Sequence, residues 1–469
     1  MNQKTLVALS AMVVIAILAF VSMRRPEKGE HVGPRERPIP AVKAADVKVL
    51  ELTANGGKDR TTLSRDGDGW KMTAPAAHPA DATAIKGALD QLEKVGFGDL
   101  VTEKKEKFAD LEVSDEKGVH VVARGDGDKV LFDGWIGKAV SGFTMVRPGG
   151  KDQAWQATGL FKYTFSKEAK VWRDHVILSF SRDDASRLAV EQAGQKLVLD
   201  KLPPPAADKD GEPPKPAPEA RWKVVESTVK VDPLDDAVAN GAVQTLSSLN
   251  AADFEDGGDA GAAGLSPPRL RITVTSKGTP GTPATLLVGG RKGDDVYAQL
   301  EGRSQIYLLH KYSIDRAAVK PADYRDKTIV KAKDAVTALE VQTAGALLSL
   351  ESSEGGWKFG KASKGEKGEI DETKAKLVAT SFDDLKGGSF AEAADLPVAG
   401  LAKPAATATV HLRDKSTVVL KVGAATKEGS DYYVQRVGSP DVLLVKKFQV
   451  DRFLKKAGDL VKTPVPAKS

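Results

Sequence analysis

The sequence predicts an α+β fold in which three tandem strand-rich repeats stand in series behind one transmembrane helix. Two observations predict this architecture. A Trp-Lys pair closes a strand pair three times, at Trp70, Trp222 and Trp357, and each time an amphipathic helix and antiparallel strands follow in the same order. An apolar segment, residues 5–23, precedes the first copy. Self-similarity at a regular period defines an architecture more firmly than any local pattern does.

Residues 5–23 are typical of a membrane anchor. They carry no charge and are about long enough to cross the hydrocarbon core as a helix. Ala19 to Met23 form a poor signal-peptidase site, so we expect an uncleaved anchor rather than a signal peptide. Basic residues are more numerous after the segment than before it, which would place the bulk of the chain in the cytoplasm. They are Lys4 before the segment and Arg24, Arg25, Lys28, Arg35 and Arg37 after it.

Composition excludes several classes of protein. The chain has 469 residues, of which 41% are hydrophobic, enough to bury a core. Its 69 basic and 64 acidic residues give a net charge of +5 and are interspersed, so we expect no nucleic-acid partner. There is no cysteine, which excludes disulfides, thiolate metal sites, cysteine nucleophiles and a lipid-modified N-terminal cysteine.

The pattern divides the chain into six parts. These are the anchor (1–25), a linker (26–45), repeat 1 (46–178), repeat 2 (179–330), repeat 3 (331–462) and a tail (463–469). Residues 202–220 interrupt repeat 2 and are rich in proline, alanine and charge. Such a composition cannot bury much apolar surface, so we predict a disordered surface insertion there.

A helix is predicted after each Trp-Lys pair. Asp81, Asp235 and Asp371 have the side chain and position of helix N-caps. Residues at helical spacing then form one face in each repeat. They are Ile85, Ala88, Leu89, Leu92 and Val95; Val238, Ala242, Val243, Leu246 and Leu249; and Lys374, Val378, Phe382 and Leu385.

The second half of each repeat also recurs. A loop with a leucine comes first, at Leu111, Leu265 and Leu401, and an apolar run then ends at Gly137, Gly289 and Gly423. A hairpin pairs Tyr297-Ala298-Gln299 with Ile306-Tyr307-Leu308, and Tyr433-Val434-Gln435 with Val442-Leu443-Leu444; Phe143 and Trp155 stand in the same places in repeat 1. Trp172-Arg173-Asp174 and Tyr324-Arg325-Asp326 close the first two repeats. Repeat 3 lacks this motif, which is the expected result for a motif that serves the junctions between repeats.

Together these motifs resemble the bacterial family called domain of unknown function 4340, in three copies. The resemblance implies a single-pass inner-membrane protein whose bulk faces the periplasm, often encoded near an ABC-type transporter linked to gliding or export. Repeat 1 departs from the family pattern, because Asp110-Leu111-Glu112-Val113 stands where Gly-Leu-x-x-Pro is expected. The resemblance carries no catalytic residues. On orientation we follow the family expectation, because short N-terminal tails can violate the positive-inside rule.

Each motif that suggests chemistry has a simpler structural explanation. Gly355 to Lys361 matches most of a phosphate-binding loop, but Ala362 stands where a magnesium-binding hydroxyl is needed, and the repeat predicts a strand there. Asp208, Asp210, Gly211 and Glu219 resemble a calcium loop only loosely, and Asp66, Asp68, Asp126 and Asp128 lie in Asp-Gly turns. The histidines His31, His78, His120, His175, His310 and His411 have no metal-ligand spacing. We predict no catalytic, cofactor or metal residues.

The sequence therefore predicts a non-enzymatic, membrane-anchored envelope scaffold, with ABC-type transporter subunits or other envelope proteins as partners. Two alternatives remain open. One is a hydrolase that uses scattered carboxylates. The other is an extracytoplasmic glycan- or peptide-binding module, which an exposed row of Trp70, Trp222 and Trp357 would favour. We predict instead that the three tryptophans are equivalent buried core anchors, which favours the scaffold.

Overall fold

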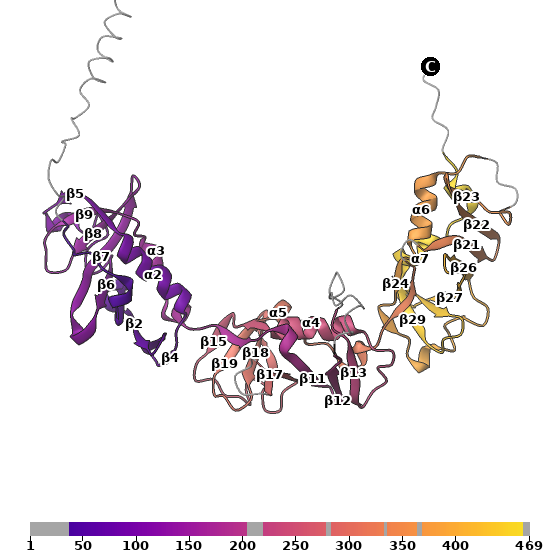
Figure 1. Ribbon diagram of the computed structural model, residues 1–469, viewed down its shortest axis with the longest axis horizontal. Helices are drawn as coiled ribbons and strands as arrows, with labels where there is room; N and C mark the ends of the chain where they lie inside the picture. Colours follow the sequence, from indigo (N-terminus) through magenta and orange to yellow (C-terminus); the bar gives the residue numbers. More distant parts are fainter. Residues whose placement is uncertain (1–36, 204–218, 278–282, 333–334, 364–367, 463–469) are drawn as a thin grey trace, which may run out of the picture. The chain divides into compact units, whose positions relative to one another are not determined.

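The computed structural model describes residues 37–203, 219–277, 283–332, 335–363 and 368–462 (Figure 1). The predicted anchor, the tail and residues 204–218 of the predicted insertion lie outside the described residues. Within them, no helix is long and apolar enough to span a membrane. The chain forms two compact units, Met1–His175 and Val176–Ser469.

The first unit is built on a nine-stranded antiparallel sheet of order β4-β3-β2-β1-β6-β7-β8-β9-β5. Helix α2 (Ala82–Lys94) contributes its apolar face to the core, and the short α3 (Lys162–Phe165) follows the last long strand. The strands are β1 (Val49–Ala54), β2 (Asp59–Asp66), β3 (Gly69–Ala74), β4 (His78–Pro79), β5 (Gly96–Thr102), β6 (Val119–Arg124), β7 (Val130–Val140), β8 (Phe143–Pro148) and β9 (Ala154–Thr158).

The second unit holds two eight-stranded sheets, each with its own core. The first contains β11 (Ala185–Gln192), β12 (Gln195–Lys201), β13 (Trp222–Ser227), β15 (Asp253–Glu255), β16 (Leu270–Ser276), β17 (Ala284–Lys292), β18 (Asp295–Leu300) and β19 (Ile306–His310). The second contains β21 (Val336–Thr343), β22 (Ala346–Ser353), β23 (Gly356–Phe359), β25 (Ser389–Phe390), β26 (Ala406–Leu412), β27 (Thr417–Ala425), β28 (Asp431–Arg436) and β29 (Val442–Lys446). Two strand pairs lie apart: β10 (Val176–Ser179) with β14 (Ser248–Asn250), and β20 (Thr328–Lys331) with β24 (Asp384–Lys386).

Strand order shows that the three sheets are copies of one fold. The orders β13-β12-β11-β16-β17-β18-β19-β15 and β23-β22-β21-β26-β27-β28-β29-β25 repeat that of the first unit, which adds only β4. The helices α4 (Asp236–Leu246) and α6 (Glu372–Thr380) correspond to α2, and α5 (Lys311–Ile314) and α7 (Lys447–Phe453) correspond to α3. The predicted α+β class, the tandem repeats and the hairpins of β18 with β19 and β28 with β29 are confirmed.

The predicted helix starts are also confirmed. The carboxylate of Asp81 accepts hydrogen bonds from the backbone N–H groups of Thr83 and Ala84, at 2.8 and 3.0 Å. Asp235 and Asp371 cap α4 and α6 in the same way. The predicted apolar faces are buried except at Val238, which is half-buried. Lys374, the one polar residue in the set predicted for α6, is partly exposed. Its ammonium group pairs with Asp371, which caps the same helix.

The three Trp-Lys tryptophans are not equally buried. Trp70 and Trp222 are 8% and 5% exposed, whereas Trp357 is only half-buried at the edge of its core. The prediction of three equivalent core anchors is therefore wrong for Trp357. In repeat 2 the Trp222 indole donates to Asn240, whereas Lys376 stands at the corresponding position after the cap of α6.

The recurring glycines hold a loop against the sheet. A Cβ at Gly289 would collide with the carbonyl oxygen of Ala263, and one at Gly423 would collide with that of Ala399. These carbonyls accept hydrogen bonds from the N–H of the next strand residue, Gly290 or Ala424, both at 2.8 Å. Only glycine lets the loop approach this closely.

Repeat 1 keeps this loop with a shifted sequence. Its carbonyl belongs to Leu111, which accepts from Lys138 N at 3.2 Å, so Val113 and not Leu111 corresponds to Leu265. Glu112 takes the place of Gly264 and has a φ of +56°, close to the +66° of that glycine. A backbone requirement for the left-handed region is thus met here by a strained glutamate.

The motif that ends each repeat contacts the helix cap of the same repeat through its backbone. The carbonyl oxygens of Trp172 and Tyr324 accept hydrogen bonds from the N–H groups of Asp81 and Asp235, the helix N-caps, at 2.9 and 2.8 Å. Leu460 does the same for Asp371 at 2.6 Å. Repeat 3 lacks the aromatic-Arg-Asp motif, as its sequence indicates, yet Leu460 and Val461 take the backbone places of the aromatic residue and the arginine.

Candidate functional site

Arg325 makes several contacts where repeat 2 meets repeat 3. Its backbone bridges Leu234, and its side chain is 9% exposed. The Nε atom donates to the carbonyl oxygen of Asp232 at 3.1 Å, and a terminal nitrogen pairs with Asp441 of repeat 3. Its guanidinium carbon lies 4.1 Å from the centre of the Phe390 ring. One side chain of repeat 2 thus contacts two elements of repeat 3.

Asp441 is held in its charged form at this joint, which we define as Lys230, Arg325, Phe390 and Asp441. Burial by itself favours the protonated carboxyl, but the hydrogen bond and charge of Arg325, together with Lys230, outweigh it and lower the pKa of Asp441. The Lys230 ammonium lies 3.5 Å from the second carboxylate oxygen. Both oxygens therefore face a cation.

Sequence reasoning identified Arg325 as a junction residue but missed its partners. Asp441 lies 116 residues further along the chain, in a turn with no distinctive pattern. In the first unit Arg173 holds the same backbone position, bridges Ala80 and is 3% exposed. A recurring, buried arginine before a new repeat is the only local signal of the joint.

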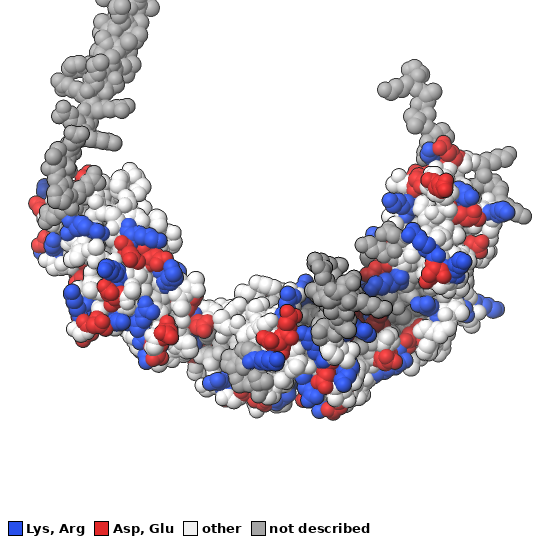
Figure 2. All heavy atoms as spheres, in the orientation of Figure 1, with Lys and Arg blue, Asp and Glu red and all other residues white. Residues whose placement is uncertain are grey.

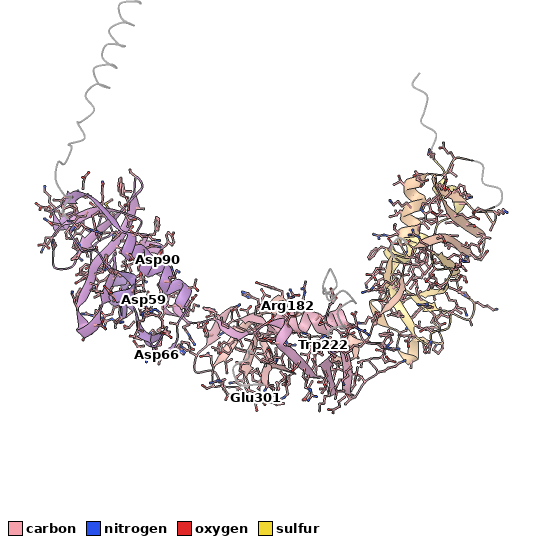
Figure 3. The ribbon with its side chains drawn as sticks, viewed as in Figure 1. Asp59, Asp66, Asp90, Arg182, Trp222 and Glu301 are labelled. Atoms are coloured by element: carbon pink, nitrogen blue, oxygen red, sulfur yellow. The ribbon has the colours of Figure 1, made fainter. Side chains whose placement is uncertain are left out.

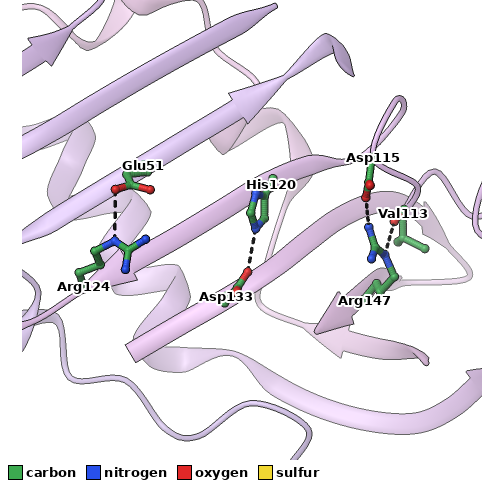
Figure 4. A network of polar contacts seen from close by, with 7 residues as sticks. All are labelled: Glu51, Val113, Asp115, His120, Arg124, Asp133 and Arg147. Atoms are coloured by element: carbon green, nitrogen blue, oxygen red, sulfur yellow. Dashed lines mark hydrogen bonds and ion pairs between the residues drawn. The ribbon is translucent and has the colours of Figure 1, made fainter. Parts of the chain in front are cut away.

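A second polar cluster lies on the sheet of the first unit, on strands β1, β6, β7 and β8 (Figure 4). His120 Nε2 lies 2.7 Å from Asp133 Oδ1, and Arg124 donates to Glu51 at 3.2 Å. The Arg147 Nε atom donates to the carbonyl oxygen of Val113 at 2.7 Å. Another nitrogen of Arg147 pairs with Asp115.

Trp135 is enclosed within this cluster. The His120 ring stacks on one face, with centroids 3.9 Å apart and planes 6° from parallel. The guanidinium carbon of Arg147 lies 3.7 Å from the ring centre. With these partners Trp135 offers no open face to a ligand, so the cluster fastens the loop before β6 onto the sheet.

The other repeats replace this cluster entirely. Strand pairing places Arg271, Leu287 and Gln299 in repeat 2, and Thr407, Lys421 and Gln435 in repeat 3, where repeat 1 has His120, Trp135 and Arg147. The fold therefore does not require it. Among the described contacts of His120 there is no hydroxyl, so the His-Asp pair has no bonded serine or threonine to activate.

A groove of about 610 Å³ lies beside α4 in the second unit, near Arg182 and Trp222, which are labelled in Figure 3. The indole Nε1 of Trp222 donates to Asn240 at 2.8 Å, and Asn240 donates to the Ala220 carbonyl at 2.8 Å. These polar groups are already paired. The charged residues of the groove carry both signs, which gives it no clear preference for a charged ligand: Arg182, Asp183, Lys201, Glu219 and Arg316.

The other sequence motifs lie in strands and turns of the fold. Trp357-Lys358 lies in strand β23, as predicted, and the next helix begins only at Glu372, whose carboxylate accepts a hydrogen bond from Trp357 N at 2.8 Å. A phosphate-binding loop would need a helix directly after Lys361. Gly67 and Gly127 have positive φ values of 58° and 63°, so the Asp-Gly sequences form turns.

The remaining candidates do not converge. His310 contacts Asp295 and His411 contacts Thr417, in different repeats. Within the described ranges no three acidic or histidine side chains are grouped to hold a metal ion. His31, Asp208, Asp210 and Gly211 lie outside those ranges. On the face of the molecule in Figure 2, basic and acidic side chains are mixed.

Comparison with known proteins gives a family but no activity. The model of the family described as "Domain of unknown function (DUF4340)" matches residues 70–268, 222–404 and 389–465. No curated protein and no solved structure gives a significant match. The first two matches begin at Trp70 and Trp222 and extend into the following repeat, and the third covers the end of repeat 3. The chain therefore belongs to the DUF4340 family, in three tandem copies.

Proposed function

We propose that the chain is a non-enzymatic accessory protein of the bacterial cell envelope. Residues 5–23 hold it in the inner membrane with its bulk in the periplasm, where it positions or couples subunits of an ABC-type transporter. Family membership supports this proposal through the transporter association that the family resemblance implies. Tandem repeats support it as well, because they commonly recognise other macromolecules along an extended surface.

The observation that carries the proposal is the joint at Arg325. A protein that presents surface to a partner gains affinity when its modules are held in one arrangement before binding. Arg325 contributes to this in two ways, because it pairs with Asp441 and packs on Phe390, both in repeat 3. A planar guanidinium is well suited to such a joint, since its donors are fixed in one plane.

A hydrolase is the rival proposal, and the His120–Asp133 pair is the observation that favours it. A general base needs a nucleophile or a water-holding partner within hydrogen-bond reach. The stacking of His120 on Trp135 gives the histidine a structural role instead.

Crosslinking of the full-length chain in intact membranes tests the proposal. We expect transporter permease or auxiliary subunits among the crosslinked proteins, and we expect deletion of residues 5–23 to abolish their recovery. A chain carrying scrambled apolar residues at 5–23 is the matched control, and it should retain recovery because it is still anchored. Turnover of ATP or a glycan by the purified chain, abolished by His120→Ala or Lys361→Ala, would overturn the proposal.

A further inference from the structure

All exposed aromatic side chains of the described chain lie at one place in the repeat. They lie in the short helix that follows the last long strand (α3, α5 and α7), except Phe161, which immediately precedes α3. In each repeat an exposed ring directly follows a lysine, and a buried apolar residue comes two positions later. These lysine–aromatic corners are Lys162-Tyr163, Lys311-Tyr312 and Lys447-Phe448, with Phe165, Ile314 and Val450 as the buried residues.

Packing does not explain the exposed rings. Tyr163, Tyr312 and Phe448 are 69%, 76% and 61% exposed, while the residue two positions later anchors each helix in the core. A single exposed apolar side chain is ordinary on a protein surface. Recurrence at the same place in all three repeats is not, since an unconstrained position can differ between them, as Trp135, Leu287 and Lys421 do.

Each ring is held in place by a neighbour. Phe161 stacks on Tyr163 at 5.5 Å, and His310 stacks on Tyr312 at 5.3 Å, with interplanar angles of 22° and 18°. The Arg452 guanidinium carbon lies 5.7 Å from the centre of Phe448. Such a contact restricts the free side chain, which lowers the conformational entropy that it loses when a ligand binds.

The lysines of the corners are neutralised within the chain. Lys162 lies 2.6 Å from Glu112, Lys311 lies 3.1 Å from Asp315, and Lys447 lies 2.9 Å from Asp451. A phosphate backbone or an anionic bilayer is bound through cations that are free to release counterions. Corners whose lysines are paired in this way suit an uncharged ligand, to which the carboxylates still offer acceptor lone pairs.

The corner of repeat 2 also has a hollow beside its ring. It measures about 750 Å³ and is lined by Asp294, Asp295, His310, Lys311, Tyr312 and Asp315. This volume is in the range of small-molecule sites, which combine an apolar surface with a few polar groups. The Tyr312 ring supplies the apolar surface, and the charged residues supply the polar groups.

We propose that the lysine–aromatic corners bind a neutral polysaccharide, with one sugar ring stacked on each exposed aromatic ring. A sugar has an apolar C–H face for the ring and a rim of hydroxyl groups for the ion-paired side chains around it. A standard protein interface buries about 800 Å² on each partner around an apolar centre, whereas each corner offers one or two rings bordered by charges. Small sites repeated along a chain fit a ligand that is itself repetitive, and several weak contacts then add up to useful affinity.

Binding of the purified full-length chain to amylose, laminarin and an N-acetylglucosamine hexamer tests this site, and the result does not depend on any transporter. We expect at least one of them to bind, and each of Tyr163→Ala, Tyr312→Ala and Phe448→Ala to weaken binding about tenfold. Tyr312→Phe keeps the ring and should keep the affinity. The control changes one exposed apolar residue in each repeat, Val130→Ala, Val225→Ala and Val437→Ala, and should bind as the unchanged chain does.

Two results would overturn the proposal. One is a full-length chain that binds none of the three glycans at millimolar concentration, or binds them equally well without its three rings. The other is ring-dependent binding to phosphatidylglycerol vesicles or to oligouridine without glycan binding, which would assign the corners to a lipid surface or to a single-stranded nucleic acid. Circular dichroism of each variant shows whether it is folded.

Discussion

Arg325 and Asp441 join repeats 2 and 3 through one largely buried ion pair. Asp441 has a second, more distant partner in Lys230. The Arg325 Nε atom also donates a hydrogen bond to the Asp232 carbonyl oxygen. The pair therefore has a fixed geometry on both sides. It connects the end of one repeated sheet with a turn of the next, so its loss affects the joint before it affects either core.

Replacement of Arg325 by alanine is expected to destabilise the second unit by about 3 kcal/mol, because it leaves the Asp441 carboxylate partly buried with only Lys230 as a partner. Urea unfolding followed by circular dichroism measures the change. Arg187→Ala is the matched control. It removes an arginine from an exposed pair with Asp200 and should cost less than about 1 kcal/mol. Equal losses of unfolding free energy in the two variants would show that the Arg325 pair stabilises the fold no more than an exposed ion pair does.

The same pair makes stability depend on pH. The folded-state pKa of Asp441 is lowered, so the unfolded chain binds a proton more readily and the pair contributes stability above the unfolded pKa, near pH 4. This contribution is lost as the pH falls through the lower folded-state pKa. Between about pH 4 and pH 2, the unchanged chain should therefore lose more unfolding free energy than Asp441→Asn. Parallel acid curves for the two proteins would contradict this.

Gly289→Ala is expected to destabilise the second unit by about 1–3 kcal/mol, because the added methyl group collides with the Ala263 carbonyl oxygen in a packed loop. Gly241→Ala is the control with the same chemical change. Gly241 lies inside α4 with open space around it, so alanine should stabilise the helix by about 0.5–1 kcal/mol. In denaturant unfolding, the two variants should change the unfolding free energy in opposite directions. Stabilisation by both changes would contradict the role of the loop contact.

Tyr324→Phe is expected to leave stability unchanged or raise it by up to about 1 kcal/mol. The side chain is fully buried, and its hydroxyl has no hydrogen-bond partner among the described residues. Removal of an unsatisfied polar group ends a desolvation cost. Tyr324→Ala removes the ring as well and should cost about 3–5 kcal/mol. A large loss in Tyr324→Phe, measured by thermal unfolding, would reveal a partner for the hydroxyl.

Local chemistry explains what the sequence predicts well. The caps Asp81, Asp235 and Asp371 and the apolar faces behind them depend on neighbours within two helical turns, so spacing alone identifies them. The recurrence of glycine at Gly137, Gly289 and Gly423 is visible in the sequence, but the loop carbonyl that requires it at Gly289 lies at Ala263, far along the chain, and is not predicted.

Contacts between distant residues explain what the sequence does not predict. Asp441 and Phe390 meet Arg325 only in the folded chain. Leu460 replaces an aromatic residue because its backbone carbonyl, not its side chain, makes the contact with Asp371. The half-burial of Trp357 is not predicted either, because the Trp-Lys pair is the same in all three repeats.

The yield of transporter subunits crosslinked to the full-length chain in membranes, compared between the unchanged protein and Arg325→Ala, tests the central claim most directly. The account predicts that transporter subunits are recovered with the unchanged chain. It also predicts that recovery falls several-fold in Arg325→Ala while the amount of anchored chain stays the same. The control Arg187→Ala should change neither the recovery nor the amount of anchored chain. Recovery that is unchanged in Arg325→Ala, or a complete absence of transporter subunits with the unchanged chain, would contradict it.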